Sequence, residues 1–231
     1  FTGGSKMADK KAIKGVIYLI AVTSILLTIL IAGNNTLLPL LAVYIGMLIV
    51  SAFIINSKDF KGNVIGLRRD NLGKSIAYAF GVAIVFYIIA KATGLSISLP
   101  FLPNSIGTQT RFFTILILAP IIETIFFQIS VFAVLLTMTS RRLLSIILTS
   151  IIFSFSHLAA YISGLYDYPS VVTGLQAISS NAGSFLAAFL FSFVAMIILV
   201  QKKITNNWFT ITLHFLLNLI VAVILSIIII S

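Results

Sequence analysis

Three ionisable side chains lie deep inside apolar stretches of this 231-residue chain, where charged groups are otherwise avoided. They are Glu123, the only glutamate, and His157 and His214, the only histidines. Lys91 is a fourth case, but its long side chain can reach water from near the end of its apolar stretch. A charge at the centre of a bilayer costs about 3 kcal/mol or more, so such residues usually face a polar cavity and mark function. A carboxylate and two imidazoles are suited to acid–base catalysis, metal binding or proton transfer.

Each of the three also has a neighbour at helical spacing. Phe153 and His157 are four residues apart and share a helix face, as do His214 and Asn218. Pro120 comes three residues before the glutamate, where it is expected to kink the helix and make room for water. We therefore expect one carboxylate, two imidazoles and an amide from three helices to line one polar pocket, with the phenylalanine as its wall.

The composition requires that membrane helices position these groups. Apolar residues make up 60% of the chain and charged residues only 9%, and the mean hydropathy is +1.18. Soluble domains are about 45–50% apolar and about 25% charged, which excludes a soluble enzyme, a disordered chain and a coiled coil. With no cysteine, thiolate chemistry and disulfides are excluded as well. The predicted fold class is all-α, a polytopic transmembrane helical bundle.

Dividing the apolar runs by the length of a membrane span, about 20 residues, gives seven predicted spans. Their approximate ranges are 15–32, 37–55, 76–97, 112–138, 143–165, 182–200 and 208–230. Residues 1–6, Gly- and Ser-rich and followed by Met7, are interpreted as a remnant of cloning. Residues 7–231 are expected to form a single integral membrane domain, with its catalytic core at about 112–220.

The basic residues predict the orientation of the bundle. A cytoplasmic N-terminus puts the segments 57–74, 141–142 and 202–203 on the same side as the N-terminal tail. These segments and the tail together hold 13 of the 15 Lys and Arg residues. Cytoplasmic loops of membrane proteins carry such an excess, so we expect the N-terminus inside and the C-terminus outside. The net charge of +10 is therefore interpreted as basic loops that contact an anionic lipid surface. Nucleic acid is not an expected partner.

Three segments carry a resemblance to a known family. APIIETIFFQ (119–128), FSFSH (153–157) and HFLLN (214–218) resemble the ordered motifs EExxxR, FxxxH and HxxxN of the CAAX-protease and bacteriocin-processing (CPBP/Abi) family. The basic segment FKGNVIGLRRDNL (60–72) is also similar to the approach to that family's core. The resemblance covers roughly residues 60–220.

The resemblance implies an intramembrane endopeptidase of the glutamate type that needs no metal or other cofactor. Glu123 would correspond to the first glutamate of the first motif, and with His157 it would activate water for attack on a peptide carbonyl. His214 and Asn218 would stabilise the oxyanion, and Phe153 would be a supporting residue. The implied substrates are prenylated CAAX peptides, bacteriocin leader peptides or other peptides delivered in the membrane.

The sequence departs from the first motif at two positions. Thr124 stands where the family has its second glutamate, and Gln128 where it has arginine. Both replacements are neutral, so no buried charge is left without a partner. We expect a Thr–Gln hydrogen bond to replace the ion pair as supporting structure.

Three other interpretations use the same residues. The carboxylate and two histidines could bind Zn or Fe, although no HExxH motif is present. A proton-coupled transporter could use them as a relay, although no inverted repeat is recognisable. The main alternative is a non-catalytic scaffold or bacteriocin-immunity protein that binds a membrane partner. The abundance of Ile, Phe, Asn and Ser favours the plasma membrane of a bacterium or archaeon.

Overall fold

The computed structural model of the protein describes residues 14–18, 20–22, 37–60, 72–93, 114–162, 182–200 and 206–230. Within these ranges all regular structure is helical, so the predicted all-α class is confirmed. The helices that are continuous are α2 (Leu37–Asn56), α3 (Leu72–Thr93), α7 (Arg142–Ile162), α9 (Ala182–Val200) and α10 (Asn207–Ile230). The polar segment 57–74 was expected to be a loop, but α3 already begins at Leu72. Residues 1–6 lie outside the described ranges.

One long helix between α3 and α7 changes its geometry along its length. It consists of η2 (Thr114–Leu118), α5 (Ala119–Glu123), η3 (Thr124–Val131) and α6 (Phe132–Thr139), where η2 and η3 are π-helical. Pro120 lies at the start of α5 and lacks the N–H that would continue the hydrogen-bonding pattern from the preceding turn. π-Helical turns are rare in proteins, but those that occur are often found at functional sites. Glu123 is the last residue of the short α-helical segment between the two π-helical ones.

The outer surface of the bundle is apolar and part of its interior is polar, as membrane packing favours. On α3 the exposed side chains include Tyr78, Phe80, Ile84 and Ile88. Among the described residues, Leu72–Ile89 and Leu116–Thr139 are long and apolar enough to cross a membrane. Shorter apolar helices cover 42–56, 142–157, 185–200 and 207–220. The seven-span count and the orientation remain predictions.

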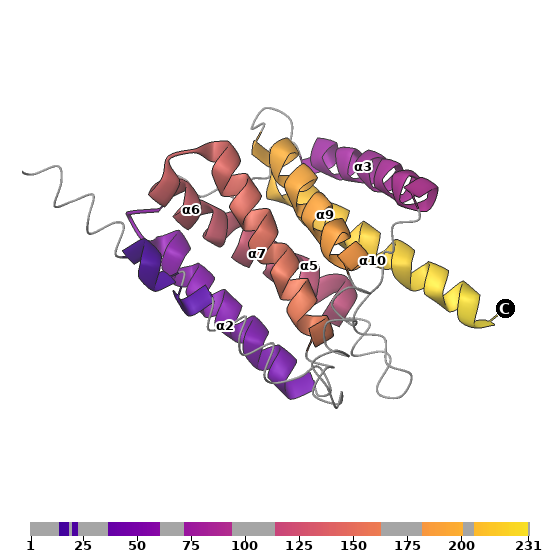
Figure 1. Ribbon diagram of the computed structural model, residues 1–231, viewed down its shortest axis with the longest axis horizontal. Helices are drawn as coiled ribbons and strands as arrows, with labels where there is room; N and C mark the ends of the chain where they lie inside the picture. The colour runs from indigo at the N-terminus through magenta and orange to yellow at the C-terminus, as the bar shows by residue number, and fades with distance from the viewer. Residues whose placement is uncertain are drawn as a thin grey trace, which may run out of the picture.

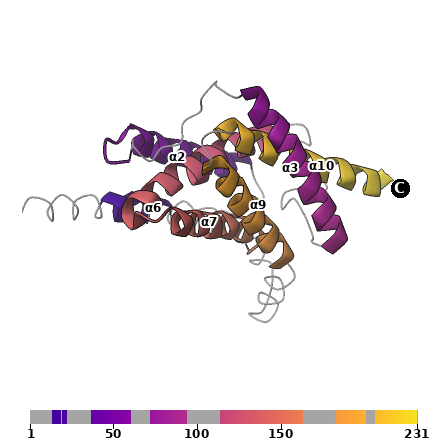
Figure 2. The ribbon, with the colours of Figure 1, turned by 90° about the horizontal axis from the view of Figure 1, so that it is seen from above.

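The helices pack as neighbours in two groups. Figure 1 shows α7 between α2 and α9, with α3 and α10 on the far side of α9. Figure 2, turned by 90°, shows α3 beside α10 at one side of the bundle, away from α2 and α7. The most extensive helix pairings are α7 with α9 and α3 with α10. The long composite helix contacts α2, α7 and α10, so it lies where all the site residues can meet.

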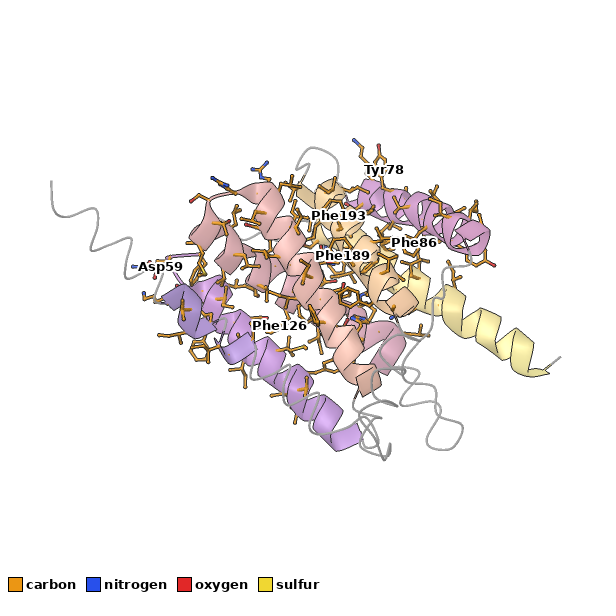
Figure 3. All side chains as sticks on the ribbon, viewed as in Figure 1. Asp59, Tyr78, Phe86, Phe126, Phe189 and Phe193 are labelled. Carbon is orange, nitrogen blue, oxygen red and sulfur yellow. The ribbon has the colours of Figure 1, made fainter. Side chains whose placement is uncertain are left out.

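Aromatic rings fill the space around the composite helix. Phe126 and Phe127 meet edge to face at 4.9 Å, and Phe127 meets Phe153 of α7 at 5.4 Å. All three are fully buried. In Figure 3 Phe126 lies on the α2 side of the bundle, whereas Phe189 and Phe193 follow α9. Edge-to-face pairs of this kind add about 1 kcal/mol each to the burial of the rings, so this core holds the site helices firmly.

The N-terminal helical residues are fastened to one end of the bundle. Lys14 pairs with Asp59 at 2.5 Å, and this hydrogen bond and attraction raise the pKa of Lys14 above its usual value. A Cβ on Gly15 would lie 2.7 Å from the sulfur of Met138, so glycine permits the close approach to α6. The turn that follows α6 has Ser140 at φ 53°. The same end of the bundle therefore holds Lys14 together with Arg141 and Arg142 at the start of α7.

Candidate active site

Three helices bring the glutamate and both histidines to one point. Glu123 Oε2 lies 3.9 Å from Nε2 of His157 on α7 and 3.8 Å from Nε2 of His214 on α10. One nitrogen or oxygen of each residue lies within 4.8 Å of those of the other two. The predicted convergence of these three residues is therefore present in the structure. Neither distance is a hydrogen bond, but a water about 2.8 Å from each atom can bridge groups at this separation.

The orientation of His157 is set by its own helix. Its Nδ1 lies 3.0 Å from the carbonyl oxygen of Phe153, one turn earlier, and 3.4 Å from the hydroxyl of Ser156. A carbonyl can only accept, so Nδ1 carries the proton and donates it. In the neutral ring this leaves the lone pair on Nε2, the nitrogen that faces Glu123. The imidazole is thereby presented as a base, or as an acceptor of a proton from a bound water.

Aromatic side chains form the wall behind both imidazoles. The Phe153 ring lies 4.4 Å from the His157 ring and 5.9 Å from the His214 ring. Phe191 of α9 lies 5.0 Å from the His214 ring. Both phenylalanines are buried. The imidazoles therefore have little freedom to turn, and the site has a low-dielectric lining in which dipoles and charges act more strongly than in water.

The site retains some access to its surroundings. The side chains of His157 and Glu123 are 24% and 15% exposed, and that of His214 is 7% exposed. Glu123 Oε2 and His214 Nδ1 are buried without a hydrogen-bond partner among the described residues. Buried polar atoms in native proteins are nearly always paired with protein or water. Glu123 Oε2 and His214 Nδ1 can therefore form hydrogen bonds to a water or a substrate that enters between the three residues.

Asn218 follows His214 by one turn of α10 and is partly buried. Its position on the same helix as His214 allows its amide to reach the same side of the site. The place of this amide in the site remains a prediction.

The expectation of a Thr–Gln hydrogen bond is wrong. Thr124 and Gln128 are both buried, each 1% exposed. Yet neither the Thr124 hydroxyl nor the Gln128 amide has a hydrogen-bond partner among the described residues. Residues four apart stack on one face of an α-helix, but both lie in the π-helical segment η3, where the repeat is longer. The regular α-helix that the expected bond assumed is therefore not the geometry of this segment.

Two features of the site were not anticipated from the sequence. The first is the pair of π-helical segments on either side of α5, for which Pro120 gave only a partial signal. The second is Phe191, which lines the His214 ring from α9 but looks like any other apolar residue of its segment. Nothing in the spacing of a uniformly apolar helix could have singled it out.

The glutamate and the two histidines could also hold a metal ion. Each offers one ligand atom to a common point, and two imidazoles with one carboxylate are a common ligand set for Zn and Fe. Ligand atoms of a tetrahedral zinc lie about 3.3 Å apart, as follows from bonds of about 2.0 Å. The 3.8 and 3.9 Å separations, and that of the remaining pair, which lies within 4.8 Å, would all have to contract to reach that geometry.

Comparison with protein families gives a match over residues 107–220, to the family described as Type II CAAX prenyl endopeptidase Rce1-like. The matched segment contains the composite helix, α7, α9 and the part of α10 that carries His214 and Asn218. It begins later than the segment of about 60–220 over which the motifs suggested a resemblance. Neither the curated proteins nor the solved structures gave a match.

Proposed function

The chain belongs, through residues 107–220, to the Rce1-like family of type II CAAX prenyl endopeptidases, and on this premise we propose that it hydrolyses a peptide bond inside the membrane. The observation that carries the proposal is the meeting of Glu123 Oε2 with the Nε2 atoms of His157 and His214 within 4 Å. Each of these groups comes from a different helix of the matched segment.

Glu123 and His157 are proposed to activate the water. A water between Glu123 Oε2 and His157 Nε2 can give up a proton to this pair while its oxygen attacks the scissile carbonyl carbon. The fixed Nδ1–H of His157 leaves Nε2 free to accept or share that proton. When the tetrahedral intermediate collapses, the C–N bond breaks and the same proton passes to the leaving amine. Protons therefore balance over one turnover, and no other reactant is needed.

His214 and Asn218 are proposed to stabilise the oxyanion. The two residues share one face of α10, so their N–H groups can point together at the developing charge. Donors fixed in this way cost no reorganisation during the reaction, and each is typically worth about 10²–10³ in rate. The aromatic wall of Phe153 and Phe191 increases their effect by keeping bulk water away.

The proposed substrate is a membrane-delivered peptide, in the first place a prenylated C-terminal CAAX peptide. The exposed surface of the helices is apolar, so a lipidated chain can approach from the bilayer. A bacteriocin leader peptide is the other substrate class suggested by the motifs. We place the protein in the plasma membrane of a bacterium or archaeon, with lipid as its surroundings.

A second candidate function is a non-catalytic scaffold or immunity protein that binds a membrane partner. The neutral Thr124 and Gln128 favour it, because they replace two charged positions of the family's first motif. The intact set of Glu123, His157, His214 and Asn218 favours the enzyme. A scaffold has no need of a carboxylate and two imidazoles that meet inside a bilayer, where such groups are costly.

The deciding experiment is cleavage in detergent by the purified protein. The substrates are a farnesylated CAAX peptide, the same peptide without its prenyl group, and a leader peptide, each followed by mass spectrometry. Glu123→Gln should abolish cleavage, because it removes the base in a nearly isosteric way. Asp59→Asn makes the same chemical change at the end of the bundle, where Asp59 pairs with Lys14, and should retain activity. Equal behaviour of Glu123→Gln and wild type in cells, with no peptide cut, would establish the scaffold instead.

A further inference from the structure

Helix α2 lies outside the matched segment, yet one face of it is buried in the bundle. The buried residues on that face are Val43, Tyr44, Met47, Ser51 and Ile54, at the spacing of a helical stripe. Of these five residues, Tyr44 and Ser51 carry a hydroxyl group, and the tyrosine's lies at the end of the longer side chain. Tyr44 is 6% exposed. The strongest packing partner of α2 is η3, the segment that follows Glu123 directly.

The register between α2 and the composite helix brings Tyr44 level with Glu123. The two helices run in the same direction (Figure 1), and Ile54 of α2 clusters with Ala133 and Val134. Ten residues before Ile54 is Tyr44, and ten residues before Ala133 is Glu123. Ten residues of α-helix span about 15 Å, and a π-helical stretch rises somewhat less, so the match holds to within about a turn.

A further observation agrees with this register. Tyr44 belongs to the same buried cluster as Ile122 and Phe126, which flank Glu123 in sequence. The tyrosine therefore meets the composite helix at the level of the carboxylate, and it comes from a helix that supplies neither histidine.

We propose that Tyr44 is a positioning residue of the site, whose hydroxyl donates a hydrogen bond to the water held by the Glu123 carboxylate. This deepens the proposed peptidase and rests on it. A carboxylate has two oxygens, and Oε2 of Glu123 is the one that faces both histidines. A donor from α2 fixes the position of that water, so that the water is held at the angle that its attack requires. The active site is then completed from outside the matched segment 107–220.

The test compares Tyr44→Phe with Tyr78→Phe. Both delete one hydroxyl and keep the ring, but Tyr78 is 49% exposed on α3 and projects away from the bundle (Figure 3). Glu123 is the only glutamate, so its modification by dicyclohexylcarbodiimide can be followed at one site by mass spectrometry. Tyr44→Phe should raise the labelling rate of Glu123 at least threefold, because the carboxylate loses the tightly held water that shields it. Tyr78→Phe should label at the wild-type rate.

Cleavage kinetics supply the second readout. If the wild type cuts a peptide, Tyr44→Phe should lower kcat about tenfold and leave KM within twofold, since the residue orients the water and does not hold the substrate. Labelling at the wild-type rate overturns the assignment whatever the cleavage shows, as does an unchanged kcat in an active enzyme. If no peptide is cut, the labelling experiment still decides the role of Tyr44, so failure of the peptidase is distinguished from failure of this inference.

Folding is checked on each variant by its melting temperature in detergent. If Tyr44→Phe does not fold, 3-fluorotyrosine at position 44 replaces it, because it retains the ring and makes the O–H a stronger donor. Labelling of Glu123 should then be slower than in the wild type, the opposite direction to the phenylalanine variant. An unchanged rate with the fluorinated residue overturns the assignment.

Discussion

Nδ1 of His157 donates a hydrogen bond to the Phe153 carbonyl at 3.0 Å, one turn earlier on α7, and thereby directs Nε2 towards Glu123. The same phenylalanine packs its ring against the imidazole at 4.4 Å. One residue therefore fixes both the proton position and the tilt of the histidine. This double contact gives the family's FxxxH spacing a physical meaning in this chain.

The first prediction concerns that histidine. His157→Ala should lower kcat about 10²–10⁴-fold, the usual contribution of a positioned acid–base group, with a melting temperature close to that of the wild type. Imidazole added to the medium should restore part of the rate, because the vacated space adjoins Glu123. Peptide cleavage with and without imidazole measures both effects. Full activity of His157→Ala would exclude the residue from the chemistry.

The second prediction concerns the oxyanion pair on α10. His214→Ala and Asn218→Ala should each slow cleavage about 10²–10³-fold with little change in KM, since an oxyanion donor acts mainly in the transition state. The double variant should be less impaired than the product of the two effects if both residues serve one oxyanion. Steady-state kinetics on the same peptide would show this. A rise in KM alone would assign the pair to substrate binding.

The third prediction concerns the altered first motif. Thr124→Glu should lower the melting temperature and the yield of folded protein, because it buries a carboxylate at a position that is 1% exposed. An uncompensated buried charge typically costs several kcal/mol. Thr124→Glu with Gln128→Arg should recover part of this stability, because the charges can neutralise each other. Thermal unfolding in detergent compares the single and double variants, and equal destabilisation of both would show that the two charges do not pair.

The fourth prediction concerns metal. The proposed peptidase needs none, so purified protein should contain much less than one equivalent of Zn or Fe and should retain cleavage after dialysis against a chelator. Elemental analysis and the peptide assay decide this. If activity is lost on chelation and returns with one metal, Glu123, His157 and His214 would be reassigned as its ligands, since their donor atoms already lie within 4.8 Å of each other.

The fifth prediction concerns topology. The native chain has no cysteine, so single substitutions can be labelled without background. A cysteine at Asn71 should react with a membrane-impermeant maleimide only after the cells are opened, and one at Asn35 should react in intact cells. The basis is the excess of basic residues on one side. The reverse pattern would invert the bundle.

The class of the fold and the residues able to carry out acid–base chemistry could be predicted from the amino-acid sequence. The high hydropathy predicts that the long apolar runs are helices, because backbone N–H and C=O groups in lipid must form their hydrogen bonds within their own segment. The single glutamate and the two histidines were conspicuous because ionisable groups are expensive in those runs. Helical spacing alone also connected Phe153 with His157, since that relation lies within one turn of a single helix.

The contacts between distant segments could not be predicted from the sequence and are seen in the folded structure. It brought Glu123 within 4 Å of both histidines, placed Phe191 against His214 and set the register that carries Tyr44 to the level of the carboxylate. It also replaced the expected Thr124–Gln128 hydrogen bond by a π-helical segment in which both side chains stay unpaired with each other. Local periodicity assumes a regular α-helix, and uniformly apolar helices carry no mark of which face meets which neighbour. Those two quantities, helix register and helix regularity, are settled by side-chain packing across the whole bundle.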